Sequence, residues 1–118
     1  MDRKDLIEYS TLLPDAKEDY PFDDLETTVM RHTTNNKWFA FFFLLDKELC
    51  VNVKVNPYEV DILCETYRGI TTGWHMNKRH WITIHVDSDV SNEEILRYIN
   101  ESYLLTASKK AKGMKTNG

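Results

Sequence analysis

A ten-residue run in the middle of the chain holds the side chains best suited to contact a ligand. Residues 72–81 read Thr-Gly-Trp-His-Met-Asn-Lys-Arg-His-Trp, with two Trp, two His and two basic residues around one Gly. Exposed rings and buried charges both cost solvation free energy, so a loop that mixes them is expected to be a contact surface. The candidate nucleic-acid or partner contacts are Trp74, His75, Asn77, Lys78, Arg79, His80 and Trp81, with Lys54 and His85 from neighbouring predicted strands.

The basic residues of this run have two alternative uses. Lys78 and Arg79 can hold a backbone phosphate while Trp81 stacks on a base, and such stacking contributes about 1–3 kcal/mol per base in single-strand binders. Alternatively, one of the two cations pairs with a carboxylate, while Trp74 and Trp81 close the end of a sheet. The two uses differ in whether the cations are free or paired.

The sequence contains no catalytic or metal-binding pattern, and we expect neither an enzyme, nor a cofactor, nor a metal. Cys50 and Cys64 form no CxxC and lack a zinc spacing to histidine. His80 and His85 lie five positions apart on one predicted strand and so face opposite sides of the sheet. Cys50 and His85 can share a face, yet no neighbouring base or dipole is evident that would activate the thiol. The glycines form no phosphate-binding spacing.

The charge distribution is uneven and acidic overall. The net charge is −4, and residues 1–26 hold nine acidic against three basic groups, whereas residues 108–118 hold four Lys and no acid. Because a protein that grips phosphates is expected to be strongly basic, this balance counts against nucleic acid as the main ligand. A solvated loop, a cation site or a contact for a basic partner would each explain the acidic cluster Glu18, Asp19, Asp23, Asp24 and Glu26.

Length and hydropathy define the domain organisation. A chain of 118 residues suits one domain with a single core. It has no apolar run of about 18 residues, and its N-terminus lacks the apolar stretch of a secretory signal. We expect a cytoplasmic protein without membrane contact, in which residues 1–107 form a single domain and residues 108–118 a flexible Lys-rich tail.

Hydrophobic periodicity predicts an alternation of helices and strands. Ser91 and Glu94 make a capping box at the start of the last helix, and Asn35–Asn36 and Asp46–Lys47 supply turns. Short connections between the first three strands make them antiparallel, and helices in such a pattern gather on one sheet face. The result is a two-layer α+β domain of order αβββα(β)βα. Helices are expected over residues 2–13, 56–69 and 91–106, and strands over residues 27–33, 37–45, 48–56, 70–73 and 80–86.

The sheet is expected to keep one face free of helices. Residues 38–45 are apolar at both parities, as is typical of a central strand with both faces at least partly covered. If the helices cover the side of Val51 and Ile82, the other side carries one parity of this Phe-rich strand and a set of mostly polar side chains. That set is Asn52, Lys54, Trp81, Thr83 and His85.

Several stretches resemble the MmcQ/YjbR family. They are residues 18–24 (Glu-Asp-Tyr-Pro-Phe-Asp-Asp), 49–57, 73–81, 87–90 and 101–103, so the resemblance extends over residues 2–107. It implies a YjbR-like α+β fold with an antiparallel sheet, and a DNA-binding role through a "double-wing" motif. The positions that match the central motif are Gly73, His75, Met76, Asn77, Lys78, Arg79, His80 and Trp81, whereas Trp74 is less typical.

The leading hypothesis is therefore a non-enzymatic MmcQ/YjbR-like module that binds DNA through the basic-aromatic loop 74–81. The alternative is a protein–protein interaction or self-association domain that uses an aromatic sheet face. The surface around Arg79 distinguishes them, because a continuous basic groove favours DNA and an apolar patch with an acidic rim favours protein.

Overall fold

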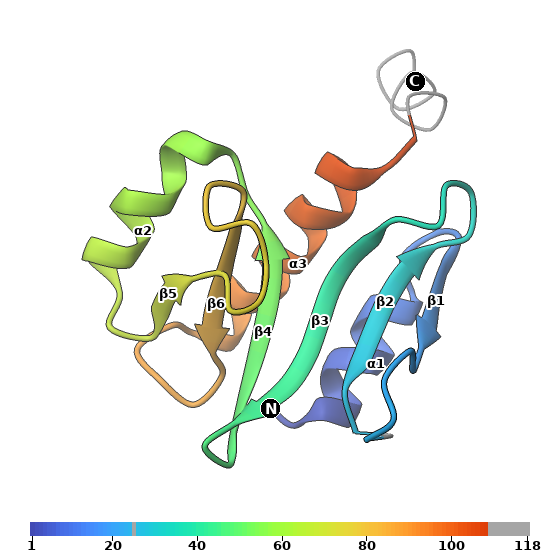
Figure 1. Cartoon of the computed structure of the whole chain (residues 1–118), viewed down its shortest axis with the longest axis horizontal. Helices are drawn as coiled ribbons and strands as arrows, with labels where there is room; N and C mark the ends of the chain where they lie inside the picture. The colour runs from blue at the N-terminus through green and yellow to red at the C-terminus, as the bar shows by residue number, and fades with distance from the viewer. Residues whose placement is uncertain (25, 109–118) are drawn as a thin grey trace.

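A six-stranded antiparallel sheet in the order β1-β2-β3-β4-β6-β5 forms the centre of the molecule. The computed structural model describes residues 1–24 and 26–108, so nearly all of the predicted tail lies outside the described residues. The elements, drawn in Figure 1, are α1 (Arg3–Thr11), β1 (Ala16–Asp19), β2 (Thr28–His32), β3 (Trp38–Leu45), β4 (Glu48–Lys54), a 3-10 turn (Pro57–Glu59), α2 (Val60–Thr66), β5 (Ile70–Thr72), β6 (Trp81–His85) and α3 (Asn92–Thr106).

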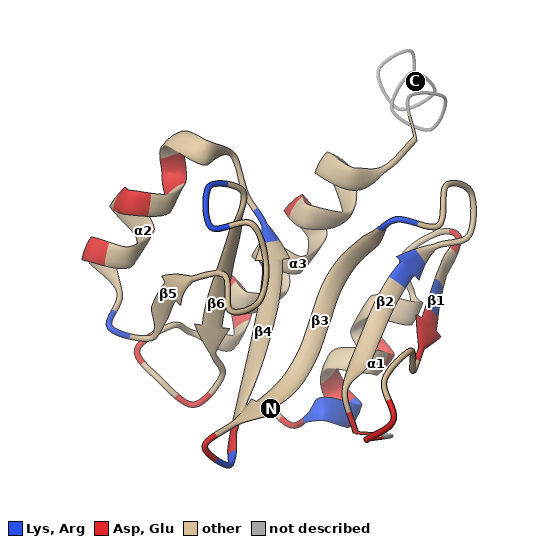
Figure 2. Ribbon diagram, viewed as in Figure 1, with Lys and Arg blue, Asp and Glu red and all other residues tan. Residues whose placement is uncertain are grey.

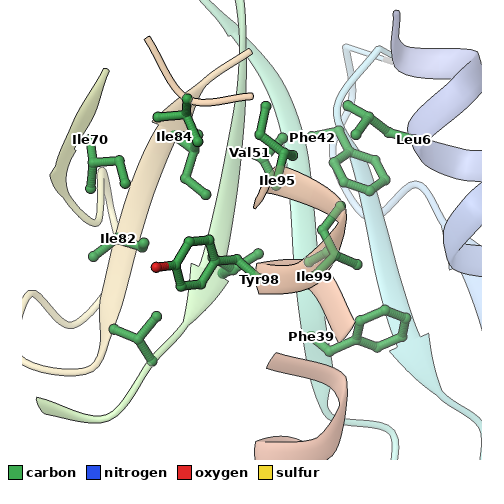
Figure 3. Close-up of a cluster of buried hydrophobic side chains, with 14 of the residues drawn as sticks. Leu6, Phe39, Phe42, Val51, Ile70, Ile82, Ile84, Ile95, Tyr98 and Ile99 are labelled. Atoms are coloured by element: carbon green, nitrogen blue, oxygen red, sulfur yellow. The ribbon is translucent and has the colours of Figure 1, made fainter. Parts of the chain in front are cut away.

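The helices cover one face of the sheet and enclose the main core, which confirms the predicted two-layer α+β class. Leu6 of α1, Leu63 of α2 and Ile99 of α3 belong to one buried cluster with the inward residues of the strands. Figure 3 shows the inward strand residues meeting Ile95, Tyr98 and Ile99 of α3. The opposite face, called here the outer face, carries no helix among the described residues, and the β5–β6 loop lies over part of it (Figure 1).

A β-bulge in β3 decides which aromatic rings reach the outer face. Met30 pairs with Ala40 and Arg31 with Trp38, so Phe39 is an extra residue between the two pairs. Such an insertion shifts the side-chain alternation by one position. Phe39 therefore enters the main core, whereas Trp38 joins Phe41 on the outer face. The bulge explains how β3, which is apolar at both parities, contributes side chains both to the main core and to a second cluster on the outer face.

Turns and caps follow the sequence pattern, with three differences. Asn36, Asp46 and Lys47 adopt positive φ as turn residues, and Ser91 accepts the Glu94 N–H as the cap of α3. No strand was predicted between residues 14 and 26, but this acidic segment contains β1, whose polar sequence suits its place at the sheet edge.

The other two differences concern α2, which was expected over residues 56–69 with Asn56 as its cap and Gly69 at its end. It is preceded by a 3-10 turn at which the Asn56 side chain makes no capping hydrogen bond. Gly69 does not end α2 in a left-handed conformation, because no described Gly has positive φ. A glycine is needed at position 69 because the backbone there lies against Ser88. A Cβ at this position would clash with the Ser88 Oγ.

Ser102 ties α3 to the two central strands. Its buried hydroxyl donates to the Phe39 carbonyl at 2.6 Å and accepts the Lys54 N–H at 2.8 Å. The first bond satisfies the bulged residue and the second satisfies the end of β4. One hydroxyl therefore fixes the helix against the position where the alternation of β3 changes.

We expect Ser102→Ala to lower the free energy of unfolding by about 1–3 kcal/mol, because it leaves a buried carbonyl and a buried N–H without their partner. Urea denaturation at neutral pH measures this loss. Thr34→Ala is the control, since Thr34 is exposed and its hydroxyl makes no hydrogen bond within the described chain. Equal stability of the two variants would contradict the assigned role of Ser102.

Candidate functional site

A buried hydrogen-bond network attaches the β5–β6 loop to the outer face. The Thr83 hydroxyl accepts the Trp74 N–H at 2.9 Å and donates to the Asn52 side-chain oxygen at 2.5 Å. The Asn52 amide in turn donates to the Trp74 carbonyl at 2.9 Å. Both side chains are fully buried, which corrects the expectation that Asn52 and Thr83 project freely from the outer face. They hold the backbone of Trp74 at two points.

The loop itself is closed by short-range contacts. The Gly73 N–H donates to the Trp81 carbonyl, and a Cβ at Gly73 would lie 2.7 Å from that of Trp81, so no larger residue fits there without a shift. The Asn77 side chain accepts the Arg79 N–H, and the Lys78 ammonium donates to the Gly73 carbonyl at 2.9 Å. Lys78 is thus used within the loop, whereas the Arg79 side chain is exposed and unpaired among the described residues.

The loop forms one wall of a groove, which we call the aromatic groove. It has a volume of about 690 Å³. Buried Phe41 and Phe43 of β3 form its floor, Phe22 stacks on Phe41 at 5.6 Å between ring centroids, and Trp74 stacks on Phe43 at 5.0 Å. The groove is lined by Phe22, Asp23, Asp24, Thr27, Trp38, Phe41, Phe43, Leu44, Trp74, His75 and Met76.

The rim of the aromatic groove is acidic. Asp23 and Asp24 are exposed, and no ion pair to either is present among the described residues. Bonds from the Thr27 hydroxyl and N–H lower the pKa of Asp24, so this carboxylate stays ionised at neutral pH. The segment between β1 and β2 is partly red in Figure 2, and blue positions lie on β2, on the β5–β6 loop and at the adjacent end of β4. The blue position on β2 includes Arg31, which is paired with Asp19.

These basic groups form a second, smaller feature. Lys54 lies opposite Trp81 in the β4–β6 register, and both side chains are half-buried. Arg79 and Asn77 are exposed on the same loop, and the His80 carbonyl accepts the Val55 N–H. Lys54, Arg79 and Trp81 thus stand at the end of the sheet, while Trp74 and His75 of the same loop line the aromatic groove.

His85, the last predicted site residue, belongs to a polar cluster at the other end of β6. Its Nδ1 lies 3.2 Å from a Glu48 carboxylate oxygen and 3.4 Å from the Cys50 sulfur. Burial, followed by the charge of Glu48, raises the pKa of the Cys50 thiol to about 11. The thiol therefore stays protonated at neutral pH, and Cys50 has no exposed surface.

The structure divides the predicted site residues into three groups and adds groove residues that were not among them. Asp23 comes from the acidic cluster, for which a basic partner was one of the alternatives, Phe22 precedes it in the chain, and Trp38 reaches the groove only through the bulge. The Tyr-Pro-Phe stretch that contains Phe22 was one signal for them, because an aromatic residue in an acidic segment needs a ring partner. Among the described residues, no helix is long and apolar enough to cross a membrane, and no cluster of ligating side chains suits a metal.

Comparison with known proteins gives one family and a common fold. A sequence model of the YjbR family matches residues 11–105. The uncharacterised protein YyaQ of Bacillus subtilis is 28% identical, and the alignment covers 88% of this chain and 97% of YyaQ. A crystal structure from Pseudomonas syringae superposes with a TM-score of 0.83 at 30% identity and covers 91% of this chain and 100% of that one. One from Deinococcus radiodurans gives 0.79 at 32%, covering 91% and 79%.

We expect Thr83→Val to release the loop, because it removes the acceptor of the Trp74 N–H and the donor to Asn52. Unfolding free energy should fall by about 1–3 kcal/mol, and tryptophan fluorescence should become more accessible to acrylamide. Thr71→Val is the control, since exposed Thr71 is the cross-strand partner of Thr83. The double variant Thr83→Val/Asn52→Ala should lose less free energy of unfolding than the sum of the losses of the two single variants. Fully additive losses would mean that the network does not act as a unit.

Proposed function

The chain belongs to the YjbR family, and we propose that it is a non-enzymatic binding module whose main contact surface for a partner protein is the aromatic groove. The observation that carries this proposal is the aromatic groove on the helix-free face, where the exposed rings of Phe22 and Trp74 stand over buried Phe41 and Phe43. Three of the large apolar side chains that are exposed, namely Phe22, Leu44 and Trp74, line this one groove. Apolar groups gathered at one concave site favour ligand or partner binding, whereas scattered ones do not.

The surface charge supports a protein partner at the groove. The surface around Arg79, which was expected to distinguish the two hypotheses, is basic through Lys54 and Arg79. The apolar patch with an acidic rim, which favours a protein partner, lies instead at the aromatic groove, where Asp23 and Asp24 supply the rim. Phosphate groups would be repelled by these carboxylates, so the groove does not suit nucleic acid.

The polar cluster around Cys50 supports the non-enzymatic part of the proposal. A nucleophilic cysteine needs a thiolate that a substrate can reach. The raised pKa of Cys50 disfavours the thiolate, and its complete burial excludes contact with a substrate in this conformation. Cys50 and Cys64 are both free thiols, which suits the reducing cytoplasm in which we place the protein.

DNA binding is the second candidate function, and it rests on the basic end of the β5–β6 loop. Lys54 and Arg79 have no ion-pair partner in the part of the chain that the structure describes, and Trp81 lies beside Lys54. A free cation pair next to a ring can hold a phosphate and stack a base. The double-wing mode of DNA binding implied by the family resemblance would use this end.

The proposed groove function predicts peptide binders that depend on Trp74. Selection from a library of random 12-residue peptides displayed on phage should enrich peptides that bind the wild-type chain. Trp74→Ala should weaken them about tenfold or more, because a central aromatic residue is a typical hot spot. Tyr58→Ala is the control, since Tyr58 is 75% exposed on the 3-10 turn and does not line the groove.

The outcomes of this selection are distinct. Peptides that bind both variants as tightly as the wild type, or no enrichment at all, would refute the groove as a contact surface. Sedimentation of the wild-type chain tests a second copy as the occupant. A dimer that Trp74→Ala dissociates and Tyr58→Ala leaves intact would assign the groove to self-association.

The DNA candidate predicts a salt-dependent affinity that needs Lys54 and Arg79. Fluorescence anisotropy with labelled single- and double-stranded DNA at low salt should show weaker binding for Lys54→Ala and Arg79→Ala. Each substitution should reduce the salt slope by about 1. Lys4→Ala, an exposed change on α1, is the control. Lys78→Ala is unsuitable, because the Lys78 ammonium holds the loop. Flat titrations of the wild-type chain with both DNA forms would refute this candidate.

A further inference from the structure

We propose that the aromatic groove recognises an arginine side chain presented by an extended segment of a partner protein, with Asp23 as its counter-charge. This inference rests on the proposed function and specifies the partner chemistry. It combines three observations: an unpaired carboxylate at the rim, ring surfaces next to it, and a length that suits a short strand.

The first observation is the unbalanced negative charge. Asp23 is exposed and makes no hydrogen bond or ion pair among the described residues. Asp24 is held by Thr27 and Glu26, so it adds charge without being free to reorient. Two cations lie near: Arg3 acts on Asp24 only through space, and Arg31 is already paired with Asp19. The Asp23 carboxylate therefore has no cation paired with it among the described residues, and the guanidinium of an arginine would form such a pair.

The second observation is that the groove wall already holds a guanidinium in the proposed manner. The Arg31 guanidinium lies 5.2 Å from the centroid of the Trp38 ring and donates to the Asp19 carboxylate at 2.6 Å. A planar guanidinium stacks on aromatic faces and pairs with carboxylates better than an ammonium does. Phe22 and Asp23, which are neighbours in the chain, place a ring and an exposed carboxylate without an ion-pair partner among the described residues in the same groove lining.

The third observation is the length of the aromatic row. From Phe22 through Phe41 and Phe43 to Trp74, successive ring centroids are 5.6, 5.0 and 5.0 Å apart. The path through the four rings is thus at most about 16 Å long, so the row can accompany no more than about five residues of an extended segment. Alternate side chains of such a segment point the same way, so an arginine at its centre and apolar residues at its ends can enter the groove together.

A pair of capped pentapeptides tests the inference. The first is Leu-Thr-Arg-Thr-Leu, and the second carries citrulline, a neutral isostere, in place of arginine. In a nuclear magnetic resonance titration at low salt, we expect the arginine peptide to shift the indole N–H signals of Trp38 and Trp74 and to leave Trp81 unchanged. It should bind about fivefold more tightly than the citrulline peptide, as expected for exposed cation–π and ion-pair contacts.

Two variants separate a charge effect from a loss of structure. Asp23→Asn should remove the preference for arginine over citrulline, while Glu65→Gln, an exposed change on α2, should keep it. Equal binding of the two peptides, or no binding of either, would overturn the inference. If the phage selection yields Trp74-dependent peptides without basic residues, the proposed groove function stands and the arginine preference is wrong. If no selected peptide depends on Trp74, both are wrong.

Discussion

The hydrogen bonds among Asn52, Thr83 and the backbone of Trp74 are the interaction on which the outer face depends. A loop that crosses a sheet must satisfy its own buried polar groups, and here two side chains from neighbouring strands satisfy both the N–H and the C=O of one loop residue. Because that residue is Trp74, fixing its backbone also fixes the indole over Phe43. Two buried polar side chains in the middle of the sheet thus hold in place the indole ring that forms one wall of the aromatic groove.

The bulge at Phe39 contributes the opposite wall. Without it, Trp38 would share a face with Ala40 and enter the core beneath α3, and the outer face would lose a ring. Ser102 stabilises the bulge from the helical side through the Phe39 carbonyl. The groove therefore depends on both layers of the domain, although its aromatic rings lie on the outer side or in the segment after β1.

Much of the fold could be predicted from the sequence, because it follows from local signals. Turn residues with positive φ, the Ser91 cap and the alternation in β6 all act within a few positions. The site could be predicted only in part. The loop 74–81 was recognised by composition, but a strand that is apolar at both parities gives no sign of where its alternation shifts. The burial of Asn52 and Thr83 depends on a loop that folds back over them, which periodicity does not reveal.

The β5–β6 loop borders the aromatic groove at one end and is basic at the other, and the sheet register explains why the two surfaces stay separate. Trp81 and Lys54 form one cross-strand row, Thr83 and Asn52 the next, and His85 and Cys50 the third. The middle row is covered by the backbone of Trp74 and separates the basic end from the acidic rim around Asp23. Trp74 and His75 line the aromatic groove, whereas Arg79 stands at the basic end of the sheet, so the two proposed ligands would contact different residues of one loop.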